Sequence, residues 1–515
     1  MSPLLLAALG CGWNHLPSGR DTYDDGPLWS PGEAVPTEDG LYVPLPLAGQ
    51  LALITDASPP TVSLVDLGPG RLDRIEAAPD GRSLVTFVER YTCTTEDLPR
   101  RVDTADECAY EDLQVSTELV VVRGGEASAG EDLPGAYNAV AFSEDARFAT
   151  AFFDFSREVE IDGVLNLTGV VVLDLERDVQ TLVPVGFAAD RILYVNDDQG
   201  AALEAVVLSR NQVALVDLTA DPPALSVTYP LSLDPDVVVD PVGADVTPDG
   251  RYALISARSS SDLYAIDLAQ PAINLIELAG APRDMVVSAD TDQTVLVYGG
   301  PTVELLDHQR FEIDAVGLDE GMDHITLVDG SAVLWGSGNQ HDLYRLDLTN
   351  HALVEYRLQN PATTVSIAPT GEMAVALTRA EGGGGSDVDA IYDAHPGMEI
   401  VDLRTDETTP FLLEGDGLGT AFSSDGTNLQ LLVLQRGVDY LYRLDLYTRQ
   451  EGRIELSAPP VAIGSMPGGR FFVTHDAPLG LVSFLDPQSG EIEEIGGFAT
   501  LGRYEPVELS GEVTP

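Results

Sequence analysis

The sequence predicts an all-β repeat protein whose units are small sheets of four strands. The main observation is a short apolar run closed by Asp, as in 481–486 (Leu-Val-Ser-Phe-Leu-Asp), which returns along the chain. Its copies end at Asp66, Arg123 (a degenerate copy), Asp174, Asp217, Asp267, Asp307, Asp347, Asp402, Asp445 and Asp486. The nine steps from the first to the last cover 420 residues, a period of about 47. Strand-type units at such a period indicate a propeller or a solenoid.

Turn signals support this prediction and divide each unit into strands. In the last unit, apolar strands are expected at 461–465, 470–475 and 480–486, with a more polar fourth strand at 491–495. A turn of the type Pro-Asp-Gly-Arg follows the first strand and recurs at 79–82 and 248–251. Its Gly supplies a positive φ and its Asp accepts hydrogen bonds from the turn backbone. We expect the Asp that closes each third strand to stabilise the next turn in the same way.

The phrase "Pro-Asp-Gly-Arg, apolar strand, loop, apolar strand ending in Asp" is clearest at 248–268 and 467–486. It resembles the repeats of bacterial β-propellers of the YVTN and WD type, over residues 41–505. The resemblance implies a single β-propeller of four-stranded blades, and stacked blades would cover each other's apolar faces. Because ten units exceed the usual four to eight blades, we expect 7 to 10 blades. Irregular units at 119–123 and 303–307, or two smaller rings, are the alternatives.

The charge of the chain restricts its partners. There are 84 Asp and Glu residues against 27 basic residues, a formal net charge of -57. Such a surface repels nucleic-acid phosphates and anionic lipids and attracts cations. Nucleic acid is therefore excluded as a partner. The acidity indicates either a solvated surface or dedicated cation binding.

The N-terminal segment suggests export. Residues 1–11 form a short apolar run that ends at Cys11, and they resemble a bacterial lipoprotein signal peptide, although a positive n-region is missing. A buried strand with an incidental Cys is the alternative. Residues 12–40 have the Pro, Gly, Asp and Ser composition of a flexible tether, and 506–515 form a C-terminal tail. We therefore expect an exported protein on the cell envelope that contacts the membrane only through a lipid anchor.

Three units carry insertions between their second and third strands, at 91–116, 154–166 and 379–396. In propellers these connections open on the same face as the inter-blade loops, so the insertions should share one face. Long loops on a rigid scaffold are frequent binding sites. Tolerated surface variation is the alternative.

The first insertion contains two kinds of candidate residues. Cys93 and Cys108 are expected to form a disulfide, with free buried thiols as the alternative. The acidic residues of the same loop are a calcium candidate, with a solvated acidic loop as the alternative, and their spacing does not match a calcium-binding loop. These residues are Asp97, Asp103, Asp106 and Glu107.

The sequence contains no recognisable catalytic motif. It has no G-x-S-x-G elbow, no Gly-rich phosphate loop after a strand and no C-x-x-C. Candidates for the channel mouth, near the starts of first strands, are Arg283, Asp284, Asp323 and His324. We therefore expect a binding or scaffold module for a protein or glycan partner, with no cofactor. The alternative is a periplasmic propeller enzyme of the lactonase, lyase or quinoprotein kind that uses a central-channel site.

Overall fold

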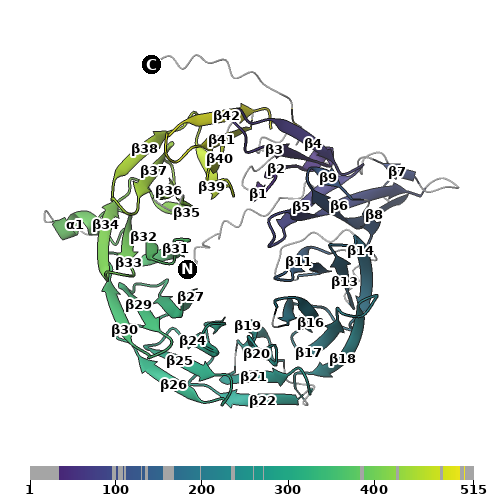
Figure 1. Cartoon of the computed structure of the whole chain (residues 1–515), viewed down its shortest axis with the longest axis horizontal. Coiled ribbons are helices and arrows are strands. Elements are labelled where there is room, and N and C mark those ends of the chain that lie inside the picture. Colours follow the sequence, from purple (N-terminus) through teal and green to yellow (C-terminus); the bar gives the residue numbers. More distant parts are fainter. Residues whose placement is uncertain are drawn as a thin grey trace, which may run out of the picture.

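The computed structural model describes residues 34–94, 100–102, 108–109, 112–128, 130–133, 137–154, 168–197, 199–232, 238–258, 260–270, 272–382, 388–424, 428–475, 480–498 and 504. These residues form ten antiparallel sheets arranged as a single β-propeller, and Figure 1 shows the closed ring. The predicted all-β propeller is confirmed, and the count is ten blades. No helix among the described residues has the length and apolar character needed to cross a membrane.

Each blade is a continuous piece of chain whose first strand is innermost. Blades 1 to 3 contain β1 (Val35–Thr37), β2 (Gly40–Leu45), β3 (Gln50–Ile54), β4 (Val62–Asp66); β5 (Arg71–Ala77), β6 (Ser83–Cys93), β7 (Arg100–Val102), β8 (Leu113–Arg123), β9 (Glu126–Ala127), β10 (Glu131–Asp132); and β11 (Ala139–Phe142), β12 (Phe148–Phe152), β13 (Gly169–Asp174), β14 (Val179–Pro184). Blades 4 to 6 contain β15 (Arg191–Asn196), β16 (Ala202–Leu208), β17 (Gln212–Asp217), β18 (Ala224–Pro230); β19 (Pro241–Val246), β20 (Tyr252–Ala257), β21 (Asp262–Asp267), β22 (Ala272–Glu277); and β23 (Asp284–Ser288), β24 (Gln293–Val297), β25 (Thr302–Asp307), β26 (Ile313–Gly317). Blades 7 to 10 contain β27 (His324–Val328), β28 (Ser331–Trp335), β29 (Asp342–Asp347), β30 (Leu353–Arg357); β31 (Ala362–Ile367), β32 (Met373–Thr378), α1 (Val388–Asp393), β33 (Gly397–Asp402), β34 (Glu407–Leu412); β35 (Gly417–Ser424), β36 (Leu429–Gln435), β37 (Tyr440–Asp445), β38 (Glu451–Glu455); and β39 (Pro460–Ser465), β40 (Phe471–His475), β41 (Leu481–Leu485), β42 (Ile492–Gly496).

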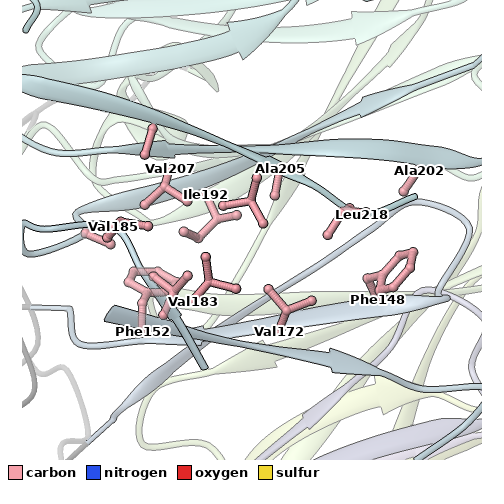
Figure 2. Close-up of a cluster of buried hydrophobic side chains, with 14 of the residues drawn as sticks. Phe148, Phe152, Val172, Val183, Val185, Ile192, Ala202, Ala205, Val207 and Leu218 are labelled. Carbon is pink, nitrogen blue, oxygen red and sulfur yellow. The ribbon is translucent and has the colours of Figure 1, made fainter. Parts of the chain in front are cut away.

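The core is a series of apolar layers between neighbouring blades. The second and third strands place Val, Leu, Ile and Phe side chains on both faces of the sheet. Each sheet is therefore apolar on both sides and needs a neighbouring sheet on each side to bury them. Figure 2 shows one layer, in which Phe148 and Val172 of blade 3 meet Ile192 and Val207 of blade 4. Burying a side chain of this size stabilises the fold by about 1.5–3 kcal/mol. Because of these repeated layers, the stability of each blade depends on contact with its neighbours.

The predicted role of the Asp that closes the third strand is confirmed. In blade 7, Asp347 Oδ1 accepts hydrogen bonds from the backbone N–H of Thr349 (2.8 Å) and of Asn350 (3.2 Å). The backbone N–H of His351 then donates to the carbonyl of Asp347. The fifth residue of this turn has a positive φ in six blades, at Asp178, Phe311, His351, Asp406, Arg449 and Gly490. A side-chain acceptor therefore holds a turn that ends in a left-handed residue.

Replacing Asp347 with Ala should lower the free energy of unfolding by roughly 1–2 kcal/mol, because two backbone donors lose a charged acceptor. Asp347→Asn should recover about half of the loss, since the amide oxygen can still accept. Urea denaturation of both variants measures this. Asp314→Ala removes an exposed carboxylate from β26 and is the matched control. Equal stability of Asp347→Ala and this control would contradict the assigned role.

One repeat differs from the sequence interpretation. The run that ends at Asp66 is β4, the outermost strand of blade 1, and not a third strand. The first strand of this blade is β1, whose neighbour in the ring is β5, the first strand of blade 2. Blade 1 therefore begins at Val35, within the range that composition assigns to the tether. The local sequence misleads because a fourth strand here carries the same apolar run and the same Asp, which accepts from the N–H of Gly68.

The predicted positions of the insertions are confirmed. All three lie between a second and a third strand: β6 and β8, β12 and β13, and β32 and β33. Figure 1 shows β6 to β8 and α1 projecting outside the ring. Cys93 and Cys108 form a disulfide in the first insertion. The insertion therefore extends blade 2 as a long, covalently closed hairpin.

Glu399 on β33 is a buried carboxylate that accepts hydrogen bonds from the backbone N–H of Gln359 (2.7 Å) and of Asn360 (3.3 Å). Burial raises the pKa of Glu399 to about 7, although these two donors oppose the shift. The folded state therefore holds a proton that the unfolded chain releases at its ordinary pKa of 4.5. Stability should fall as the pH rises from 4.5 to 7 and stay level above that.

Glu399→Gln should remove this pH dependence and raise stability at pH 8, by up to about 3 kcal/mol, because the amide oxygen still accepts and carries no charge. Melting temperatures of the variant and the wild type at pH 5 and pH 8 test the expectation. Glu407→Gln, an exposed change on the neighbouring β34, is the matched control. A Glu399→Gln variant that is less stable than the wild type at pH 8 would contradict it.

Candidate functional site

The candidate site lies on the face of the ring that carries the second-to-third connections and the inter-blade loops, here named the insertion face. A pocket of about 450 Å³ opens there across blades 5, 6 and 7. Its lining residues are Val242, Arg258, Ala281, Pro282, Arg283, Tyr298, Asp323, His324 and Ser337. These residues lie at the ends of first and second strands or in the connections beside them. The pocket is therefore built by the ends of strands and their connecting loops, and not by the central part of any one blade.

Three of the four predicted channel-mouth residues meet in this pocket. Asp323 is the central member: its Oδ1 accepts from the backbone N–H of Ser337 (2.8 Å) and its Oδ2 accepts from the Ser337 hydroxyl (2.9 Å). The guanidinium of Arg283 lies 3.5 Å from Oδ2, and Nε2 of His324 lies 3.6 Å from Oδ1. The second distance exceeds a hydrogen bond. Asp323 therefore positions Arg283 by electrostatic attraction. The ring of His324 instead stacks on the ring of Trp335, with the ring centroids 4.1 Å apart.

A glycine makes room for Arg283. Gly299 has a φ of +76°, and a Cβ at this position would lie 2.8 Å from Nε of Arg283. The backbone of the connection after β24 can therefore approach the guanidinium closely. The side chain of Arg283 lies over this glycine and stays 63% exposed.

Arg258 is the second cation of the pocket, and sequence reasoning missed it. Its Nε donates to Asp240 (3.1 Å), and Asp240 also lies 3.7 Å from Nε of Arg210. The carboxylate of Asp240 thus lies close to two guanidinium groups, and the side chain of Arg258 remains 72% exposed. The signal in the sequence is weak, because a single Arg after a second strand also occurs at Arg210, Arg379 and Arg436.

Tyr298 closes one side of the pocket. Its hydroxyl donates to the buried carboxylate of Glu304, which also accepts from the backbone N–H of Ala279. Burial, followed by the effect of Glu304, raises the pKa of Tyr298 above its ordinary value. The hydroxyl therefore stays protonated and is not a general base at neutral pH.

Asp284, the fourth predicted residue, does not line this pocket. Its Oδ1 accepts from the N–H of Met285 (2.9 Å) and its Oδ2 accepts from the N–H of Ile325 (2.9 Å) on β27. Since β27 is the innermost strand of blade 7, this donor lies on the free edge of its sheet. Asp284 thus joins the first strands of two neighbouring blades. Its role in the structure is therefore to join two blades, and it is not a lining residue of the pocket.

A buried Ser–His pair in blade 10 has no such access. Nε2 of His475 lies 2.7 Å from the hydroxyl of Ser483, and Nδ1 lies 2.8 Å from the carbonyl of Ala458. Both side chains are buried, and burial lowers the pKa of His475. A nucleophile must reach its substrate, so this neutral pair is an interior polar network rather than a catalytic centre.

The remaining candidates from the sequence lie outside the described residues. These are Cys11 and the proposed calcium residues Asp97, Asp103, Asp106 and Glu107. Within the described part of the chain, no group of three or more His, Cys, Asp or Glu side chains comes together as a metal site.

Comparisons with known proteins yield distant structural likenesses. No family model matches the chain, and no similar sequence was found among curated proteins. Hydrazine synthase of Kuenenia stuttgartiensis is 13% identical, with 50% of this chain and 79% of that chain covered at a TM-score of 0.31. Dihydro-heme d1 dehydrogenase NirN in complex with DHE is also 13% identical, with 64% and 71% covered at a TM-score of 0.39. Likenesses this distant carry no statement about activity.

Proposed function

We propose that this chain is an exported β-propeller that works as a binding module for a protein or glycan partner. The single observation that carries the proposal is the pocket on the insertion face, where Arg258 and Arg283 remain largely exposed beside Asp323 and His324. Convergent polar groups in a concave site are typical of ligand recognition. Among the described residues that line the pocket, the hydroxyl of Tyr298 already donates to Glu304, whereas Arg258 and Arg283 keep exposed donors, so the pocket is suited to hold a polar ligand.

The disulfide supports the exported part of the proposal. Disulfides persist in oxidising compartments and are rare in the cytosol. The Cys93–Cys108 bond therefore supports a protein that works outside the cytoplasm. The apolar run that ends at Cys11 supports a lipid anchor that holds it at the cell envelope. Radiolabelled palmitate should label the expressed protein, and Cys11→Ala should abolish the label and release the chain from the membrane fraction. A Cys11→Ala protein that fractionates like the wild type would remove the anchor.

The binding role is tested with the full chain on arrays of glycans and of peptides. The wild type should bind a set of ligands that the Arg258→Ala/Arg283→Ala double variant loses. Arg310→Ala is the matched control, because Arg310 is an exposed Arg in a third-to-fourth turn on the opposite face. An identical binding pattern of the wild type and the double variant would contradict the proposal. Turnover of a lactone or a glycan that His324→Ala abolishes would favour the enzyme alternative instead.

A further inference from the structure

We infer that the pocket on the insertion face binds an anionic sugar, with the sugar carboxylate between Arg258 and Arg283 and a hydroxyl on Asp323. The inference rests on the proposed binding function and specifies its ligand. It starts from an electrostatic contrast: the chain has a net charge of -57, yet this pocket exposes two guanidinium groups. Positive charges exposed in a pocket of a strongly negative protein indicate a site that attracts a negatively charged ligand.

Both guanidinium groups have donors to spare. Arginine carries five N–H donors in a planar fork that matches a carboxylate in two-point contact. Arg258 contacts Asp240 through Nε at 3.1 Å, and Arg283 contacts Asp323 through Nη1 at 3.5 Å. The remaining donors of these exposed groups are available to a ligand. Because both residues line the same pocket, a carboxylate bound there can accept hydrogen bonds from them.

The charge balance of the pocket favours one negative charge on the ligand. The charged lining residues are Arg258, Arg283 and Asp323. Asp240, which contacts Arg258, also contacts Arg210, so this cluster carries three positive and two negative charges. A monoanion neutralises this pocket, whereas a phosphate monoester carries about 1.5 to 2 negative charges at neutral pH. A long polyanion would be repelled by the strongly negative chain as a whole. The ligand is therefore short and carries one negative charge, as a carboxylate does.

Asp323 and the apolar wall give the reason for a sugar. Each carboxylate oxygen can accept more than one hydrogen bond, so Asp323 can accept a ligand hydroxyl in addition to its bonds from Ser337. A uronic acid combines the carboxylate that the Arg residues need with the hydroxyl donors that Asp323 needs. Val242, Ala281 and Pro282 supply an apolar wall for the carbon face of the ring. A pocket of about 450 Å³ suits one or two sugar units.

The test is isothermal titration calorimetry of the full chain with three matched sets of disaccharides. The first set ends in glucuronic, galacturonic or mannuronic acid, the second in the neutral hexoses, and the third in the hexose 6-phosphates. At least one uronic acid should bind at least about tenfold more tightly than its neutral and phosphorylated counterparts. Arg258→Ala and Arg283→Ala should each weaken that binding by about tenfold or more, while Arg310→Ala leaves it unchanged.

Failure of this inference is distinguishable from failure of the binding function. Equal binding of the neutral or phosphorylated set, or an unchanged affinity in Arg283→Ala, would overturn the anionic sugar. Lack of binding by all three uronic acids would overturn it as well. If array ligands of another class still depend on Arg258 and Arg283, the binding function stands and only the ligand class is wrong. Unaltered thermal melting of each variant confirms that the ring itself is intact.

Discussion

Replacing Arg90 with Met is expected to lower the free energy of unfolding by about 3–5 kcal/mol, because it breaks a buried ion pair. The side chains of Arg90 on β6 and Glu118 on β8 are only 3% and 8% exposed. Nε of Arg90 donates to Glu118, and its two Nη atoms donate to the carbonyls of Leu67 and Pro69, each at 2.6 Å. The guanidinium of Arg90 thus joins β6 to β8 within blade 2 and also binds the loop that connects blade 1 to blade 2.

The expected loss of stability comes from the hydrogen-bond acceptors that Arg90 binds, which remain without this donor in the variant. Met fills a similar volume but offers no donor, so Glu118 loses its guanidinium partner, and the buried carbonyl of Leu67 and the carbonyl of Pro69 each lose a donor. Guanidinium chloride denaturation followed by circular dichroism measures the change. The double variant Arg90→Met/Glu118→Leu should recover part of the stability, since apolar replacement of a whole buried pair is often neutral. A single variant that costs less than about 1 kcal/mol would show that the pair is dispensable.

The architecture was predictable from sequence because each blade repeats local chemistry. Nine Asp residues and the Pro-Asp-Gly-Arg turns act within a few residues of their own position, so they are visible in any single unit. The same locality explains the error at Asp66. Its bond to the N–H of Gly68 does not depend on whether the strand before it is third or fourth. The position of a strand within its sheet depends on pairing across the chain, which a local pattern does not encode.

The site was predictable only where it follows from topology. Arg283, Asp323 and His324 lie beside the starts of first strands, and first strands of neighbouring blades are adjacent in a ring, so their proximity follows from the fold. Arg258 and Ser337 come from second-to-third connections, whose path is set by side-chain contacts such as those of Asp240 and Asp323. Those contacts depend on distances that no repeat pattern fixes.

Replacing Phe484 with Ala is expected to cost about 3–5 kcal/mol and to open the ring between blades 10 and 1. This junction joins the two ends of the described chain, and among the described strands none crosses it. It is held by side chains: Phe484 and Phe472 of blade 10 pack against Leu41 and Val43 of blade 1. Arg470 adds contacts across the same junction, at 3.5 Å from Asp56 and 3.3 Å from the carbonyl of Ala57.

Phe148→Ala is the matched control, because Phe148 occupies the corresponding interior layer between blades 3 and 4 and also has an Arg over its ring. Both variants lose a buried aromatic side chain, but blades 3 and 4 remain joined by the chain. Hydrogen–deuterium exchange should therefore rise in β1 to β4 and β39 to β42 of Phe484→Ala, and only around the cavity in Phe148→Ala. The same distribution of exchange in both variants would mean that closure does not depend on this layer. The physical reason for the asymmetry is connectivity, since a covalent link keeps two blades at high effective concentration and a side-chain layer alone does not.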